Sequence, residues 1–180
     1  NEMNGKTVMS YITSHDDGSP FDKNRQNPWD AGTRLLLTPG ISQVYYGDET
    51  ARPLEVEGVD GDANLRSNMN WNDIKSNSET ESLLKHFQKI GQFRRNHPAV
   101  GAGKQTDLQN DPYVFFRKYE NDEVIISVGY FREQKLINVA SLWKDGTKVR
   151  DFYTGTIGVV KNGTSVMNTN ADTVLLERMD

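Results

Sequence analysis

Tyr11-Ile12-Thr13-Ser14-His15-Asp16-Asp17 is a short β-rich run that ends in a group of ionisable side chains. The turn formers Gly18-Ser19-Pro20 follow directly, so the strand is expected to stop at this polar group. In α/β folds, the carboxyl ends of strands hold side chains rigidly at the mouth of a cleft. The segment therefore predicts a functional site at a strand end, although many ordinary loops also carry His and Asp.

A helix and a second strand follow this run. A first strand is expected over residues 8–14. Asn27 as the cap and Pro28 at the first helical position then predict a helix that continues to residue 37, and Pro39-Gly40 ends it. A second strand is expected over residues 41–46, ending at Gly47-Asp48-Glu49. This order is a βαβ unit, which implies parallel strands with their polar ends at the same edge.

The remaining sequence predicts a loop, a helix and then a β-rich region. Residues 50–73 show no periodicity and read as a long loop. Ser78-Glu79-Thr80-Glu81 is typical of a capping box, and a helical stripe continues from it to about Pro98. Beyond residue 103, short apolar runs alternate with turn residues, which favours an antiparallel sandwich. Strands are expected over residues 113–119, 123–130, 136–142, 148–153, 158–160 and 173–178. We predict two domains, 1–100 and 101–180.

Composition limits the classes of protein that the chain can belong to. The 180 residues carry a net charge of −4 without a basic block, which argues against a nucleic-acid partner. No apolar run approaches the length of a membrane span, so no membrane partner is expected. The absence of cysteine excludes disulfides and thiol chemistry. The compartment stays open, with a secreted or periplasmic location slightly favoured.

Several motifs resemble those of the α-amylase family of glycoside hydrolases, and they follow one another along the chain in the same order as in that family. The run over residues 35–49 resembles the approach to the eighth strand of the family's catalytic barrel, and Ser14-His15-Asp16 resembles the motif that ends the seventh. Ser14 stands where that family usually has Asn. Three later stretches also resemble the family: Arg66 to Asp73, Phe93 to Ala99, and the region with Asp145-Gly146-Thr147 and Asp151 to Gly155.

The resemblance implies a fold and a chemistry. It implies an α/β plus all-β chain: the last two β/α units of a TIM (β/α)8 barrel, followed by an antiparallel β-sandwich. It also implies cleavage of α-glucosidic bonds in starch-like glucans by a retaining mechanism. Asp16 matches the family's transition-state stabiliser, and His15 matches a histidine that binds the same sugar. The nucleophile and general acid sit on the fourth and fifth strands, which this sequence lacks, so the chain alone is expected to be inactive.

Other polar residues leave alternatives open. Arg25 is a candidate substrate-binding residue, but Arg25 and Arg66 are equally suited to clamping loop carboxylates. Asp48 and Glu49 are expected to fix loops by hydrogen bonding. Trp71 is more often a packed residue than a sugar-stacking one in such a segment. The acidic group Glu55, Glu57, Asp60 and Asp62 lacks the regular spacing of a calcium loop, so neither a metal nor another cofactor is expected.

Function also has more than one interpretation. The first is a fragment of an α-amylase-type hydrolase whose partner is an α-glucan oligosaccharide or polysaccharide. A second is a non-catalytic module that binds glucan or has a structural role. A related α-glucosidase or transglycosylase shares the same motifs. Two barrel strands cannot close a barrel, so self-association through exposed barrel strands also stays open.

Overall fold

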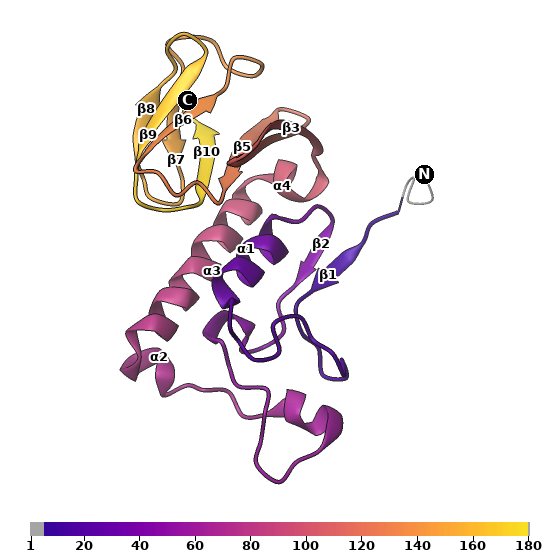
Figure 1. The fold of residues 1–180 in the computed structure, drawn as a ribbon. Coiled ribbons are helices and arrows are strands. Elements are labelled where there is room, and N and C mark those ends of the chain that lie inside the picture. The colour runs from indigo at the N-terminus through magenta and orange to yellow at the C-terminus, as the bar shows by residue number, and fades with distance from the viewer. Residues whose placement is uncertain (1–5, 180) are drawn as a thin grey trace. The chain divides into compact units, whose positions relative to one another are not determined.

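The computed structural model describes residues 6–179, and the chain forms two compact units, Asn1–Gln92 and Phe93–Asp180 (Figure 1). The division falls within helix α3 (Ser78–Asn96) rather than at the predicted boundary between residues 100 and 101. The last turn of α3 explains the difference. The ring of Phe93 lies 5.6 Å from that of Phe152, and His97 lies 2.8 Å from Asp122 and 2.7 Å from Glu177.

The first unit contains the predicted βαβ arrangement. Strand β1 (Met9–Tyr11) pairs in parallel with β2 (Ile41–Gln43), and helix α1 (Pro28–Leu37) connects them in sequence. Both strands are shorter than the predicted ranges 8–14 and 41–46. The reason is a change of partner, because Thr13 and the backbone N–H of Tyr45 both donate to the Asp48 carboxylate.

The side chains that cap helices α1 and α3 differ from the predicted ones. Asn27 makes no side-chain cap bond at α1, whereas Asp22 accepts the backbone N–H groups of Gln26 and Asn27 at 2.7 and 2.9 Å. At α3 the cap lies one residue before the predicted capping box. There the Asn77 side chain accepts the N–H of Glu79 at 2.9 Å and that of Thr80 at 3.3 Å. Helix positions were therefore predictable, but the capping side chains were not.

Short helices occupy the segment that was predicted to be one long loop. They are the 3-10 turns η1 (Asp48–Thr50) and η2 (Gly61–Arg66) and the single-turn helix α2 (Asp73–Ser76). In the second unit, α4 (Pro98–Ala102) follows α3 after the break that Pro98 causes. None of these elements is long enough to show the helical periodicity on which the sequence prediction depended.

After α4, the second unit consists of antiparallel strands and the loops between them. Its larger sheet has the order β3-β4-β5-β10-β7-β8, and β6 pairs with β9 in a second sheet. The larger sheet comprises β3 (Lys104–Asn110), β4 (Tyr113–Tyr119), β5 (Asp122–Val128), β10 (Val174–Arg178), β7 (Lys148–Asp151) and β8 (Ile157–Val159). The smaller one comprises β6 (Gln134–Asn138) and β9 (Thr164–Asn168). Strand β3, an edge strand with mostly exposed residues, and β9 were not predicted.

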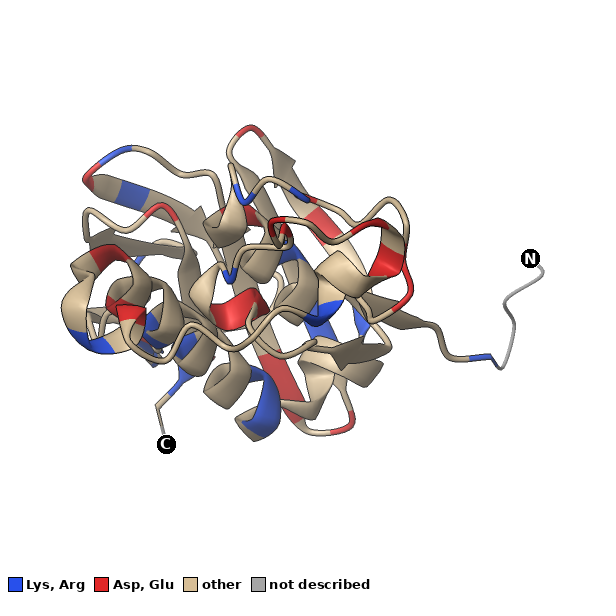
Figure 2. Ribbon diagram, turned by 90° about the horizontal axis from the view of Figure 1, so that it is seen from below, with Lys and Arg blue, Asp and Glu red and all other residues tan. Residues whose placement is uncertain are grey.

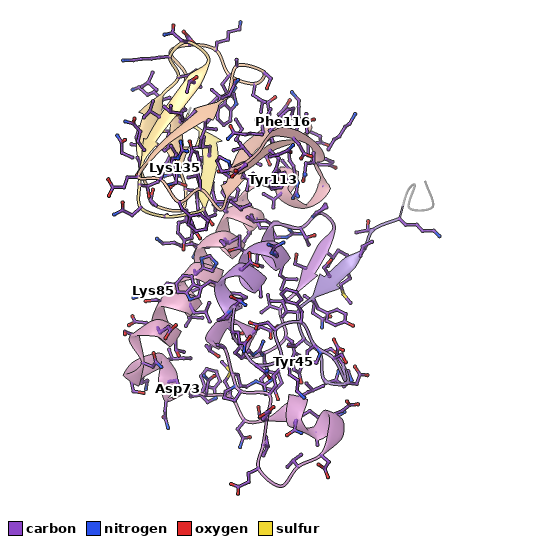
Figure 3. All side chains as sticks on the ribbon, viewed as in Figure 1. Tyr45, Asp73, Lys85, Tyr113, Phe116 and Lys135 are labelled. Atoms are coloured by element: carbon purple, nitrogen blue, oxygen red, sulfur yellow. The ribbon has the colours of Figure 1, made fainter. Side chains whose placement is uncertain are left out.

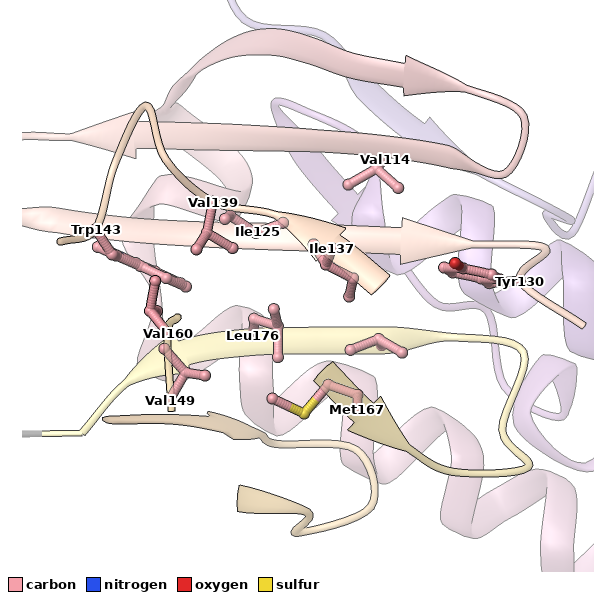
Figure 4. Close-up of a cluster of buried hydrophobic side chains, with 11 residues drawn as sticks. Val114, Ile125, Tyr130, Ile137, Val139, Trp143, Val149, Val160, Met167 and Leu176 are labelled. Carbon is pink, nitrogen blue, oxygen red and sulfur yellow. The ribbon is translucent and has the colours of Figure 1, made fainter. Parts of the chain in front are cut away.

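A hydrophobic core joins the two sheets of this unit (Figure 4). Ile125 of β5 and Leu176 of β10 contribute from the larger sheet, and Ile137 of β6 and Met167 of β9 contribute from the smaller one. All four side chains are at most 1% exposed. Burial of this kind supplies the main stabilisation of an antiparallel two-sheet unit.

Asp151 organises the backbone at the end of β7. One of its carboxylate oxygens accepts the N–H groups of Leu175 and Tyr153, at 2.8 and 3.1 Å, and the other accepts the N–H and hydroxyl of Thr154. Burial raises the pKa of Asp151 above its ordinary value, and these hydrogen bonds offset only part of that effect.

Two helical glycines give a matched test of packing. A Cβ at Gly32 of α1 would lie 2.4 Å from a ring carbon of Phe87, whereas a Cβ at Gly91 of α3 would meet nothing within 4 Å. We expect Gly32→Ala to lower the free energy of unfolding by about 1–3 kcal/mol through overpacking. Gly91→Ala should raise it by about 0.5–1 kcal/mol through backbone entropy. Urea unfolding of both variants measures this, and equal effects would contradict the packing argument.

The pKa direction of Asp151 predicts a pH dependence. Because the folded state binds the proton more tightly than the unfolded state, the contribution of Asp151 to stability falls as pH rises from about 3.9, the unfolded value. Asp151→Asn cannot ionise and should lack this fall. As pH rises from about 3 to about 7, the free energy of unfolding of Asp151→Asn should therefore increase relative to that of the wild type. Hydrogen exchange of the β10 amides across this range measures the free energies of both proteins. An increase for the wild type relative to Asp151→Asn would contradict the raised pKa of Asp151.

Candidate functional site

The chain passes from buried to exposed within a few residues at the end of β1. Ile12 and Thr13 are 5% and 0% exposed, whereas the side chains of His15 and Asp16 are 65% and 62% exposed. The Ser14 hydroxyl donates to Asp16 Oδ1 at 3.1 Å, and His15 Nε2 lies 3.5 Å from Asp16 Oδ2. The structure thus brings His15 and Asp16 together as an open pair that is oriented by its neighbours.

A buried carboxylate lies behind this pair. Asp48, which begins η1 and is 1% exposed, accepts a hydrogen bond from the Thr13 hydroxyl at 2.6 Å. Arg25 Nη2 donates to the same oxygen at 2.9 Å, and the Tyr45 N–H donates to the other oxygen at 3.3 Å. The end of β1, the following loop and the end of β2 therefore meet at one side chain. Asp48 fixes loops, as predicted.

Arg25 itself has a conformation that suits this role. Its φ is 54°, which is unusual for a residue other than glycine, and its side chain is only 9% exposed. Its guanidinium contacts Asp48 and also donates from Nε to the Arg52 carbonyl at 3.0 Å. Of the two roles that the sequence left open, the contacts match the clamp. The predicted substrate contact of Arg25 has no test in the structure.

A second arginine holds the long loop. Arg52 is fully buried and donates to the carbonyls of Tyr46, Leu65 and Ser67 at 3.1, 3.0 and 3.0 Å. Its guanidinium also stacks over the Tyr46 ring at 4.1 Å and lies 5.6 Å from that of Tyr45 (Tyr45 is labelled in Figure 3). Gly47 has a φ of 89°, and a Cβ there would lie 2.4 Å from Arg52 Nε. The corner after β2 therefore requires glycine.

Arg66 links this loop to the candidate pair. It ends η2, and its Nε donates to the His15 carbonyl at 3.1 Å. Arg52 thus fixes the neighbouring residues Leu65 and Ser67, and Arg66 in turn holds the backbone that carries His15. Sequence reasoning missed both Thr13 and Arg52, because neither has a pattern around it that distinguishes a buried hydrogen-bonding residue from an exposed one.

Trp71 is placed differently from the expectation. It is 68% exposed and does not pack beneath the loop, so that expectation is wrong for this chain. Glu55, Glu57, Asp60 and Asp62 are all exposed. Within residues 6–179, no group of three or more His, Cys, Asp or Glu side chains could hold a metal ion.

The charge distribution, the lengths of the helices and a cavity bear on which partners the chain can bind. Segments with Lys and Arg and segments with Asp and Glu are scattered over the ribbon (Figure 2). In the part of the chain that the structure describes, the helices are too short or too polar to cross a membrane. Next to Arg25, a cavity of about 280 Å³ is lined by Lys23, Asn24, Pro53 and Glu55, among others. Cationic and amide groups of this kind can donate hydrogen bonds to a hydroxylated ligand.

Known proteins resemble the chain in sequence. The periplasmic α-amylase of Escherichia coli (strain K12) is 41% identical over 126 residues, which are 69% of this chain and 18% of that protein. The cyclomaltodextrin glucanotransferase of Geobacillus stearothermophilus is 29% identical over 124 residues, 67% of this chain and 16% of that protein. The chain thus spans less than a fifth of the length of these two relatives. No family model matches.

Solved structures share the fold. The crystal structure of AmyP in complex with maltose matches with a TM-score of 0.67 and 18% identity, over 95% of this chain and 40% of that one. An Anoxybacillus α-amylase matches with a TM-score of 0.67 and 19% identity, over 97% of this chain and 39% of that one. Sequence and fold therefore agree over most of the chain, which belongs to the α-amylase family as a C-terminal portion of such a protein.

Proposed function

We propose that this chain supplies part of the glucan-binding cleft of a retaining α-amylase-family glycoside hydrolase and is inactive alone. The observation that carries the proposal is the exposed His15–Asp16 pair at the carboxyl end of β1, backed by the buried Asp48 cluster. Strand ends of this kind carry the chemistry in (β/α)8 barrels.

We propose further that β1, α1 and β2 belong to the last two β/α units of such a barrel, and that the second unit is the sandwich domain that follows. The parallel register of Met9 with Ile41 supports the first assignment. The core between the two antiparallel sheets supports the second. In a barrel, the carboxyl ends of the strands all face the same cleft. Asp16 follows β1 and Asp48 follows β2 in the sequence, so both residues belong to that end of the strands.

The proposed chemistry of the pair follows from its exposure. An ionised Asp16 carboxylate can accept hydrogen bonds from two sugar hydroxyls, and those bonds strengthen as positive charge develops on the ring. His15 can donate to or accept from a hydroxyl of the same sugar. Ser14 and Arg66 limit the motion of both residues, so little ordering is required when a sugar binds.

The same geometry explains why the chain alone should not cleave glucans. A retaining glycosidase needs a nucleophile and a general acid, with their carboxyl groups roughly 5 Å apart. Asp48 cannot serve with Asp16 in such a pair, because it is buried and both of its oxygens already accept hydrogen bonds. The proposal therefore assigns the nucleophile and the general acid to residues other than Asp16 and Asp48.

Similar proteins support one class of ligand for this chain, the α-glucans. Two solved structures of similar fold are complexes of AmyP with maltose and maltotriose, which supports an α-glucan ligand for this chain. Several relatives are cyclomaltodextrin glucanotransferases, so transfer to a sugar acceptor is the second candidate function. The periplasmic relative supports a periplasmic or secreted location.

Exposed apolar side chains on the paired strands support self-association. Met9, Tyr11 and Ile41 are 52%, 46% and 55% exposed. Because β1 and β2 form a two-stranded sheet, each also has an edge that is open to pairing with another strand. We propose that the isolated chain associates through these edges in a concentration-dependent manner.

Activity and binding test the main proposal together. The chain should release no reducing sugar from soluble starch. In an NMR titration with maltotriose, the amide signals of His15 and Asp16 should shift. Asp16→Ala should weaken binding about tenfold or more, the value of a hydrogen bond to a charged group.

Asp17→Ala is the matched control for this titration. Asp17 is the next residue and accepts a turn N–H, from Ser19 at 3.1 Å, so its removal should leave maltotriose affinity unchanged. Turnover of starch that Asp16→Ala abolishes would disprove inactivity. Shifts that avoid residues 14–17 would disprove the binding site.

The role of Arg25 can be separated by stability. If Arg25 clamps Asp48, then Arg25→Ala or Asp48→Asn should each lower the free energy of unfolding by about 3–5 kcal/mol, since each leaves a buried polar partner unmatched. The double variant should cost less than the sum of the two. Urea unfolding measures the cycle. Additive effects, combined with weakened maltotriose binding by Arg25→Ala, would instead indicate direct substrate contact.

A further inference from the structure

The hairpin before β9 turns on Asn162-Gly163. Lys161 and Thr164 exchange backbone hydrogen bonds of 2.9 and 3.0 Å on either side of these two residues. Asn162 has a φ of 50° and Gly163 a φ of 70°, as a type I′ turn requires. Asn-Gly is the preferred sequence for this turn, so the turn geometry alone explains the choice of residues.

Asn-Gly is also chemically labile. The backbone nitrogen of Gly163 can attack Cγ of Asn162, forming a C–N bond and a five-membered succinimide. The Gly163 nitrogen loses its proton, and the side-chain amide leaves as ammonia. Water then opens the ring to give aspartate or isoaspartate. Glycine favours the reaction because no side chain hinders its nitrogen, and the exposed Asn162 is open to water.

The Asp145 carboxylate holds the atoms that this reaction needs. Its Oδ1 accepts the Gly163 N–H at 2.8 Å, and its Oδ2 accepts the Asn162 N–H at 2.8 Å. On the other side, the Gly163 carbonyl accepts the Val139 N–H at 2.9 Å. A Cβ at Gly163 would lie 2.8 Å from Ala140 Cβ, so the turn is also closely packed. Asn162 and Gly163 are thus fixed from both sides.

These contacts oppose succinimide formation in two ways. The nucleophilic nitrogen must give up its proton, and a carboxylate that accepts this N–H disfavours the negative charge that would develop there. The peptide plane must also rotate towards the Asn162 side chain, which would break the bonds to Asp145 and Val139. The two backbone hydrogen bonds lower the pKa of Asp145, so its carboxylate is ionised at neutral pH.

We propose that Asn162-Gly163 is a latent deamidation site and that Asp145 is the residue that keeps Asn162 intact in the folded protein. The proposal does not depend on the glucan site. Deamidation here would place a second carboxylate beside Asp145, and isoaspartate would also lengthen the backbone of a two-residue turn. Deamidation would therefore weaken the contact between Asp145 and the turn.

A rate measurement tests the proposal on the whole chain. The protein is held at mildly alkaline pH, and the aspartate and isoaspartate formed at each Asn are followed by peptide mapping with mass spectrometry. A second Asn-Gly sequence, Asn4-Gly5, reports whether a substitution changes the conditions of the reaction in general. In the wild type, Asn162 should deamidate more slowly under native conditions than in urea. Asp145→Ala should accelerate Asn162 about tenfold or more and leave Asn4 unchanged.

Two controls separate a specific shield from general rigidity. Asp17→Ala also removes a carboxylate that accepts a turn N–H, and it should leave the Asn162 rate unchanged. In urea, the Asn162 rates of the wild type and Asp145→Ala should become equal, which covers the case in which the variant folds poorly. A folded Asp145→Ala protein with the wild-type rate would overturn the proposal, as would a native wild-type rate at Asn162 equal to the rate in urea.

Discussion

The buried ion pair of Asp48 with Arg25 is the contact on which the candidate site depends. Neither β1 nor β2 has more than three residues, so backbone pairing alone cannot hold the chain segments that leave them. Asp48 compensates by accepting from Thr13 after β1, from Arg25 in the loop and from Tyr45 after β2. A side chain thus continues the connection where the strand ladder stops, and His15 and Asp16 project from that point.

Much of this arrangement could be predicted from the sequence. The βαβ order, the α1 start at Pro28 and the strand ends with polar residues all follow from local patterns, and so does the adjacency of His15 and Asp16. The clamps could not be predicted. Arg52 is separated by 13 to 15 residues from the carbonyls of Leu65 and Ser67 that it holds, and its burial depends on the fold of the intervening loop. Strand β3 was missed because its mostly polar side chains show no alternation of apolar and polar residues. The cap of α3 was assigned to Ser78 and not to Asn77 because both adjacent residues have side chains that can cap a helix.

Carboxylates in the second unit mainly organise the backbone. Asp145 accepts two turn amides, Asp151 accepts three N–H groups around the end of β7, and Asp122 accepts the Ala99 N–H at 2.8 Å. Each satisfies donors that would otherwise face solvent or an apolar neighbour. In the first unit, Asp22 and Asp48 do the same. Exposure therefore separates Asp16 from the buried carboxylates Asp48 and Asp151, which the backbone donors around them already occupy.

The strand order of the larger sheet has a consequence for how the second unit forms during synthesis. Strand β10 is the last strand in sequence but lies in the middle of the sheet, between β5 and β7. The β3-β4-β5 meander can assemble from neighbouring residues, but it joins β7 and β8 only when β10 arrives. On a ribosome, which makes the chain from its amino end, the sheet would remain two separate pieces with open edges until residues 174–178 had emerged.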